Sequence, residues 1–160
     1  MKKFFGFLIF LAILVFSGHI VFPHCEIPCG IYNDAMRFTF IAEHIKTIEK
    51  AMKQIKELSA QSPQNFNQIV RWVVNKEKHA EEIQHIISQY FMTQRLKSVD
   101  TMNSEAFKVY IEKLRLCHSI LVDTMKCKQT TDLTRVEQLK SHVENFKKAY
   151  FERQKKSPNP

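Results

Sequence analysis

The apolar residues of this chain form one continuous run near the N-terminus and four periodic stripes after it. The continuous run, Phe4–Phe16, contains 13 residues and no polar side chain. From about residue 34 onward, apolar residues recur at spacings of three and four, the repeat of an amphipathic helix. The stripes are Phe38, Ile41, Ile45, Ile48, Met52 and Ile55; Phe66, Ile69, Val70, Val73, Ala80, Ile83, Ile87 and Tyr90; Phe107, Tyr110, Leu114, Cys117, Leu121 and Met125; and Val136, Leu139, Val143, Phe146 and Tyr150.

Polar and turn-forming residues between the stripes predict where each helix begins and ends. Asn33 or Asp34 can cap the first helix, which we expect to end near Ser59. Ser62-Pro63 predicts the start of the second helix, with serine as the cap and proline at the first helical position. Further polar breaks are predicted at residues 93–103 and 129–131. Four helices with short connections predict an all-α fold, an antiparallel up-and-down four-helix bundle.

The first 23 residues differ in composition from the rest of the chain. They contain two lysines, no acidic residue and six of the 13 phenylalanines. Lys2-Lys3, the apolar run and then Ser17-Gly18 have the order of a secretory signal peptide. An uncleaved membrane anchor over Phe4–Phe22 is the alternative, because a segment of 19 residues could just cross a bilayer. Gly18 and His19 interrupt the run and favour cleavage, so we expect an exported protein, periplasmic or extracellular.

Composition excludes several classes of protein. The chain has 24 basic and 16 acidic residues, and two of the basic ones lie in the first 23, which leaves a net charge of +6 on the remainder. This mixed charge has no long basic block, so we expect no nucleic-acid partner. Only one of three glycines, Gly30, follows residue 23, which argues against a glycine-rich nucleotide fold. Four cysteines are too few for a disulfide scaffold.

The cysteines and histidines of the helical region have structural interpretations. Cys117 and Cys127 are ten residues apart, about 15 Å along a helix, which is too far for a disulfide. We expect Cys117 in the core, whereas Cys127 is either a stray thiol or a site of intermolecular bridging. No pair of histidines has an i,i+4 spacing, so solvated or capping roles are expected for His44, His85, His118 and His142.

The segment between the apolar run and the first helix carries the candidate chemistry. It contains His24, Cys25 and Cys29, with Pro28 before the second cysteine and Gly30 after it. A rigid proline and a permissive glycine suit a tight turn. Two thiolates and an imidazole within six residues form a donor set suited to zinc, copper or nickel. On spacing alone, a Cys25–Cys29 disulfide remains the alternative, favoured by an oxidising compartment.

This segment resembles the nickel hook of nickel-dependent superoxide dismutases, a family of four-helix-bundle subunits. Similarity continues more weakly to about residue 91. The resemblance implies one nickel ion per subunit, held by the α-amine and imidazole of His24, the amide nitrogen and thiolate of Cys25, and the thiolate of Cys29. It also implies an antioxidant oxidoreductase that converts superoxide to oxygen and hydrogen peroxide, and assembly as a homohexamer. Six of the nine positions match: His24, Cys25, Pro28, Cys29, Gly30 and Tyr32.

The same resemblance implies roles for residues around the metal. Tyr32 would stand near the open face of the nickel and donate hydrogen bonds to the entering anion. Tyr90 either pairs with Tyr32 or is simply the last core residue of the second helix. The family supports the axial imidazole with a glutamate and an arginine, but the aligned positions here hold Ile41 and His79. The partner of the His24 imidazole is therefore open between His79 and Glu43.

The α-amine of His24 can bind metal only after the chain is cut between Pro23 and His24. Proline is a poor residue before a signal-peptidase site, whereas Val15-Phe16-Ser17 is acceptable. We therefore expect two-step maturation, in which a second protease removes residues 18–23. The predicted organisation is a signal and pro-segment at 1–23, a nickel hook at 24–33, the bundle at 34–156 and a tail at 157–160.

Two other functions are compatible with the sequence. The first is an exported helical-bundle protein that binds nickel or copper without turnover, which the altered support of the His24 imidazole would favour. The second is an interaction or chaperone-like bundle in which Cys25 and Cys29 form a plain disulfide.

Overall fold

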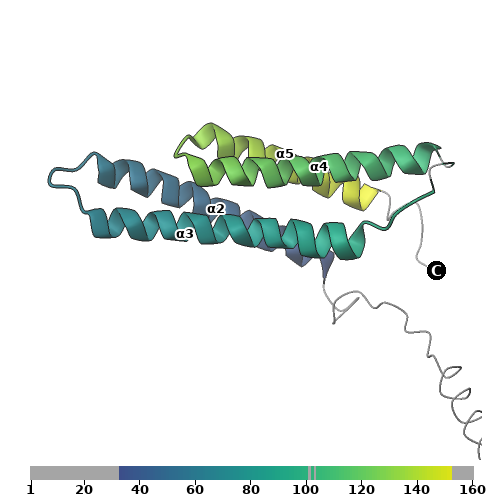
Figure 1. Cartoon of the computed structure of the whole chain (residues 1–160), viewed down its shortest axis with the longest axis horizontal. Helices are drawn as coiled ribbons and strands as arrows, with labels where there is room; N and C mark the ends of the chain where they lie inside the picture. The colour runs from purple at the N-terminus through teal and green to yellow at the C-terminus, as the bar shows by residue number, and fades with distance from the viewer. Residues whose placement is uncertain (1–32, 101, 103, 153–160) are drawn as a thin grey trace, which may run out of the picture.

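Long helices make up the folded body of the protein. The computed structural model describes residues 33–100, 102 and 104–152, and the predicted hook ligands lie outside these ranges. Within them the chain forms four α-helices, one extended by a π-helix, and no strand. α2 and α3 form one antiparallel hairpin, α4 and α5 form a second, and the two pack along each other (Figure 1). The elements are α2 (Asp34–Ser59), α3 (Phe66–His85), η1 (Ile86–Arg95), α4 (Ser104–Gln129) and α5 (Leu133–Glu152).

The predicted first helix is confirmed at both ends. The Asn33 side chain caps α2 by accepting a hydrogen bond from the amide of Met36 at 3.2 Å, which satisfies one of the free N–H groups of the first turn. The helix ends at Ser59, and every member of its predicted apolar stripe is buried. Among the described residues, no helix is long and apolar enough to span a membrane.

The predicted start of the second helix was wrong. α3 begins at Phe66, and Ser62-Pro63 lies in the connection before it, where the peptide bond is cis. The cap is Asn65, whose side chain accepts from the amide of Gln68 at 3.2 Å. Asparagine caps a helix at least as well as serine does. Asn65 also stands directly before the apolar stripe, so the helix begins there and not at Pro63.

The second helix also extends further than its stripe predicts. Ile86–Arg95 forms a π-helix that continues α3, so residues 93–95 are helical and not part of a connection. Hydrogen bonds five residues apart mark this segment, including the amide of Leu96 to the carbonyl of Phe91 at 2.9 Å. The wider turn places residues five apart on one face. Arg95 therefore lies over the Tyr90 hydroxyl, to which its Nη2 donates at 2.9 Å.

Half of the predicted second stripe is not in the core. Phe66, Val70 and Val73 are 67%, 58% and 37% exposed. Ile69 is half-buried. The reason is the unequal length of the two hairpins. The tip of the α2–α3 hairpin extends beyond the α4–α5 turn, so neither α4 nor α5 covers this end of α3 (Figure 1).

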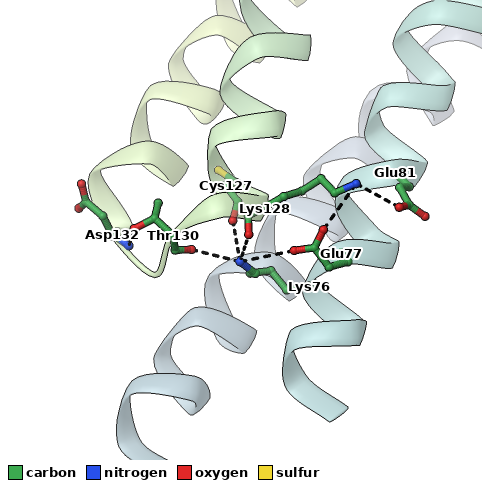
Figure 2. A network of polar contacts seen from close by, with 7 residues as sticks. All are labelled: Lys76, Glu77, Glu81, Cys127, Lys128, Thr130 and Asp132. Carbon is green, nitrogen blue, oxygen red and sulfur yellow. Dashed lines mark hydrogen bonds and ion pairs between the residues drawn. The ribbon is translucent and has the colours of Figure 1, made fainter. Parts of the chain in front are cut away.

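A buried lysine joins the two hairpins (Figure 2). Lys76 lies on the core face of α3, and its Nζ donates to the carbonyls of Cys127 at 3.0 Å, Thr130 at 3.2 Å and Lys128. The last carbonyls of a helix have no partner within it and carry partial negative charge, so a cation satisfies them well. Burial lowers the pKa of Lys76. Cys127 is fully buried here, as is Cys117, so neither thiol lies on the surface of the subunit.

An ion pair between α2 and α5 should make the bundle sensitive to acid. Lys140 and Lys53 donate to Glu49 at 2.8 and 2.6 Å, and these hydrogen bonds lower the Glu49 pKa to about 2. A depressed pKa gives stability above the ordinary value of 4.5 that is lost as the pH falls toward 2. Because the pair is partly solvated, we expect Glu49→Gln to cost about 1 kcal/mol at pH 7. The difference from wild type should vanish near pH 2 in urea unfolding.

The control for this prediction is Glu137→Gln. Glu137 binds the same Lys140 at 2.8 Å, but both residues lie within α5. We expect its loss to leave stability nearly unchanged. Equal effects of the two substitutions would contradict a stabilising link between α2 and α5.

Candidate functional site

Three elements meet at the carboxylate of Asp34, the first residue of α2. Tyr150 of α5 donates its hydroxyl to Asp34 Oδ2 at 2.8 Å, and Tyr90 of η1 donates to Oδ1. The Nε of Arg95 lies 2.9 Å from Oδ1. The start of α2 and the ends of η1 and α5 lie at one end of the bundle (Figure 1). We call these four residues the Asp34 cluster. It adjoins residue 33, the last residue of the predicted hook.

The Asp34 cluster is largely screened from solvent and fixes the Tyr90 side chain. Tyr90 and Tyr150 are 5% and 6% exposed. Burial and the neighbouring Asp34 carboxylate raise the pKa of both phenols, which keeps them protonated as donors. The Tyr90 hydroxyl donates to Asp34 and accepts from Arg95. The guanidinium carbons of Arg37 and Arg95 each lie 4.9 Å from the centroid of the Tyr90 ring. Tyr90 is thus held by charged groups on both its hydroxyl and its ring.

An aromatic cluster lies beneath these polar groups. Phe91 is 4.8 Å from Phe38 and 5.1 Å from Phe146, measured between ring centroids, and 5.2 Å from Tyr150. Phe38, Phe91 and Phe146 come from α2, η1 and α5, so the rings anchor the same three elements that meet at Asp34. Edge-to-face contacts of this kind add to the burial of apolar area. Packed aromatic rings therefore support the end of the bundle that carries Asp34.

The structure places some of the predicted site residues and not others. His24, Cys25, Cys29 and Tyr32 lie outside the described residues. Tyr90 is buried in the core, as one of its two interpretations required. Its contacts with Asp34 and Arg95 were not predicted. Asp34 is 56 residues away along the chain, and Arg95 was placed in the break after the helix.

Two histidines that were expected to be solvated have partners. His44 of α2 faces His79 of α3, with 2.8 Å between their Nδ1 atoms. His142 Nδ1 lies 2.5 Å from the buried Asp123. His85 and His118 are exposed, as expected. An i,i+4 spacing indicates contacts within one helix, whereas each of these contacts joins two different helices.

The supporting positions named by the resemblance are also located. Ile41 is fully buried in the core, so it offers no polar group to a metal site. Glu43 is exposed, and His79 contacts His44. The residues at these positions therefore do not form the glutamate–arginine pair of the family.

Comparison with known proteins now decides the family. Residues 19–155 match the family of nickel-containing superoxide dismutases. The chain belongs to this family. It is thus a nickel superoxide dismutase, an oxidoreductase that converts two superoxide anions and two protons to oxygen and hydrogen peroxide with nickel as its cofactor. No curated protein and no solved structure gives a significant match. The family match favours neither a metal carrier without turnover nor a chaperone-like bundle.

The described residues contain no cluster of protein ligands large enough to hold the nickel of this dismutase on its own. In residues 33–100, 102 and 104–152, no group of three or more His, Cys, Asp or Glu side chains could hold a metal ion. The hook sequence brings two cysteines and a histidine within six residues. Thiolate and nitrogen donors suit nickel, and four of them in a plane are a geometry that Ni(II) favours.

Proposed function

We propose that this dismutase binds its nickel in the hook at residues 24–33, through His24, Cys25 and Cys29. The carrying observation is that the family match spans the whole hook and continues into a bundle whose Asp34 cluster begins directly after it. When bound, nickel supplies the one-electron chemistry that alternately oxidises and reduces superoxide. The thiolates of Cys25 and Cys29 add negative charge at the metal, which stabilises its higher oxidation state.

Residues beside the hook then shape access to the site. We assign Tyr32 to the open face of the metal, where its phenol screens the site and donates to a small anion. Tyr90 supports Tyr32 from the side away from the metal, because the Tyr90 hydroxyl is already hydrogen-bonded to Asp34 and Arg95. Arg37, Arg95 and Asp34 together contribute a net charge of +1 beside Tyr90. A positive region at the entrance favours the approach of an anionic substrate.

The bundle and the segments around the hook complete the proposal. Residues 1–23 direct export and are removed, residues 34–156 form the folded body and residues 157–160 a tail. The subunits assemble as homohexamers. In support of assembly, Phe66, Val70, Val73 and Val74 form an exposed apolar stripe on α3 that the rest of the bundle leaves uncovered. Exposed apolar patches of this kind mark sites of association.

Processing provides the direct test of this function. Protein that begins at His24, loaded with nickel under reducing conditions, should remove superoxide at a rate typical of a dismutase. Protein with one additional residue before His24 should lack activity, because its α-amine is no longer at the metal. N-terminal sequencing of the active species from its natural source should begin at His24. An active species that begins at Gly18 would contradict the proposal.

A further inference from the structure

Two imidazoles from neighbouring helices converge away from the Asp34 cluster. His44 lies in α2, ten residues after Asp34, and His79 lies in α3, eleven residues before Tyr90. Their Nδ1 atoms are 2.8 Å apart, and their ring centroids are separated by 5.0 Å. Both side chains are half-buried, so one edge of the pair reaches solvent. The two helices are long and pack closely along each other, which fixes the pair in place.

The geometry of the pair suits a particular class of metal ion. In the structure the two rings share a hydrogen bond, in which one Nδ1 donates to the other. If a metal ion displaces that proton, the lone pairs of both Nδ1 atoms become available to the ion. An ion about 2.0–2.1 Å from each nitrogen would make an N–metal–N angle of about 85–90° when the nitrogens are 2.8 Å apart. That angle joins neighbouring positions of a square-planar or octahedral site, as Cu(II) and Ni(II) prefer, and is narrower than a tetrahedral angle.

We propose that His44 and His79 form a second metal site, outside the hook, that binds Cu(II) or Ni(II) with water completing the coordination. Burial and the neighbouring His79 lower the pKa of His44, so its ring is neutral and able to act as a ligand at pH 7. The carboxylates of Glu43 and Glu82 act on His44 in the opposite sense. Their negative charge also favours a nearby cation. In this site His79 pairs with His44, so His79 is not the partner of the His24 imidazole.

The test uses the full chain with the hook disabled by His24→Gln, Cys25→Ser and Cys29→Ser. Calorimetric titration with CuCl₂ at pH 7.5 should show one site, and electron paramagnetic resonance should show two equatorial nitrogen donors. Adding His44→Gln or His79→Gln should weaken binding roughly tenfold or more, because two ligands on a rigid scaffold act together. ZnCl₂ should bind more weakly than CuCl₂.

The control is His118→Gln, which removes an exposed histidine from α4 and should leave the affinity unchanged. Circular dichroism and thermal unfolding without metal identify any variant that fails to fold. If a glutamine variant fails to fold, the melting temperature provides a second measurement. Copper should raise the melting temperature of the hook-disabled parent by ligand linkage, and it should not raise that of the His44→Ala/His79→Ala double variant. Equal affinity in the parent and both glutamine variants would overturn the site, as would an equal loss in His118→Gln. Neither result bears on the hook, which is absent from every protein compared.

Discussion

Replacing Cys29 with serine is expected to remove nickel and dismutase activity together. A serine hydroxyl is not ionised at neutral pH, so the metal loses an anionic sulfur donor and the stabilisation of its higher oxidation state. Residues that only support a metal ligand already cost about 10–100-fold in affinity or activity when changed. Loss of the ligand itself should therefore exceed about 100-fold. Nickel content by atomic absorption and superoxide decay after pulse radiolysis measure the two effects.

Cys117→Ala is the matched control for this result. The Cys117 thiol is buried in the core, and burial raises its pKa to about 12, so it remains protonated and unavailable to a metal. This variant should keep a full complement of nickel while losing some stability. A Cys29→Ser protein that retains stoichiometric nickel and turnover would exclude the hook as the site.

Replacing Asp34 with alanine should have the largest effect on stability. The substitution removes the shared acceptor of two tyrosines and leaves Arg95 without its carboxylate in a mostly buried site. Breaking such a pair by removing one partner costs about 3 kcal/mol. Asp34→Asn retains an acceptor for the hydroxyls and should cost about half as much. Urea unfolding of the processed, nickel-loaded protein measures both.

Activity distinguishes positioning of Tyr90 from a purely structural role of this cluster. If Asp34 and Arg95 position Tyr90 behind the metal, Asp34→Asn should lower kcat/KM even at a temperature where the variant is fully folded. A loss of stability cannot explain such a decrease. Tyr150→Phe removes one hydrogen bond to Asp34 and should cost about 1 kcal/mol with activity retained. Tyr110→Phe, outside the cluster, should change neither. Unchanged kcat/KM in folded Asp34→Asn would contradict a role in positioning.

The sequence predicted local features of this dismutase well because their causes are local. Periodic apolar residues located all four helices, and the Asn33 cap lies three residues from the amide that it binds. The donor set of the hook is compact for the same reason, since His24, Cys25 and Cys29 fall within six positions. The start of α3 was predicted three residues too early, because Ser62-Pro63 was taken as the cap and first helical residue although Asn65 stands directly before the apolar stripe.

Contacts between helices required the tertiary structure. Asp34 and Tyr150 are 116 residues apart, His44 and His79 are 35 apart, and Lys76 reaches a carbonyl 51 residues away. In α2 and α5 the apolar stripe shows which face of the helix is buried, but not the axial register of that helix against the next. In α4 the stripe misses the buried face, because Cys117 is its only buried member. The axial register decides which polar side chains meet, and why half of the α3 stripe remains exposed. The sequence alone thus predicted the helices and the candidate metal donors, whereas packing decided which side chains meet at Asp34.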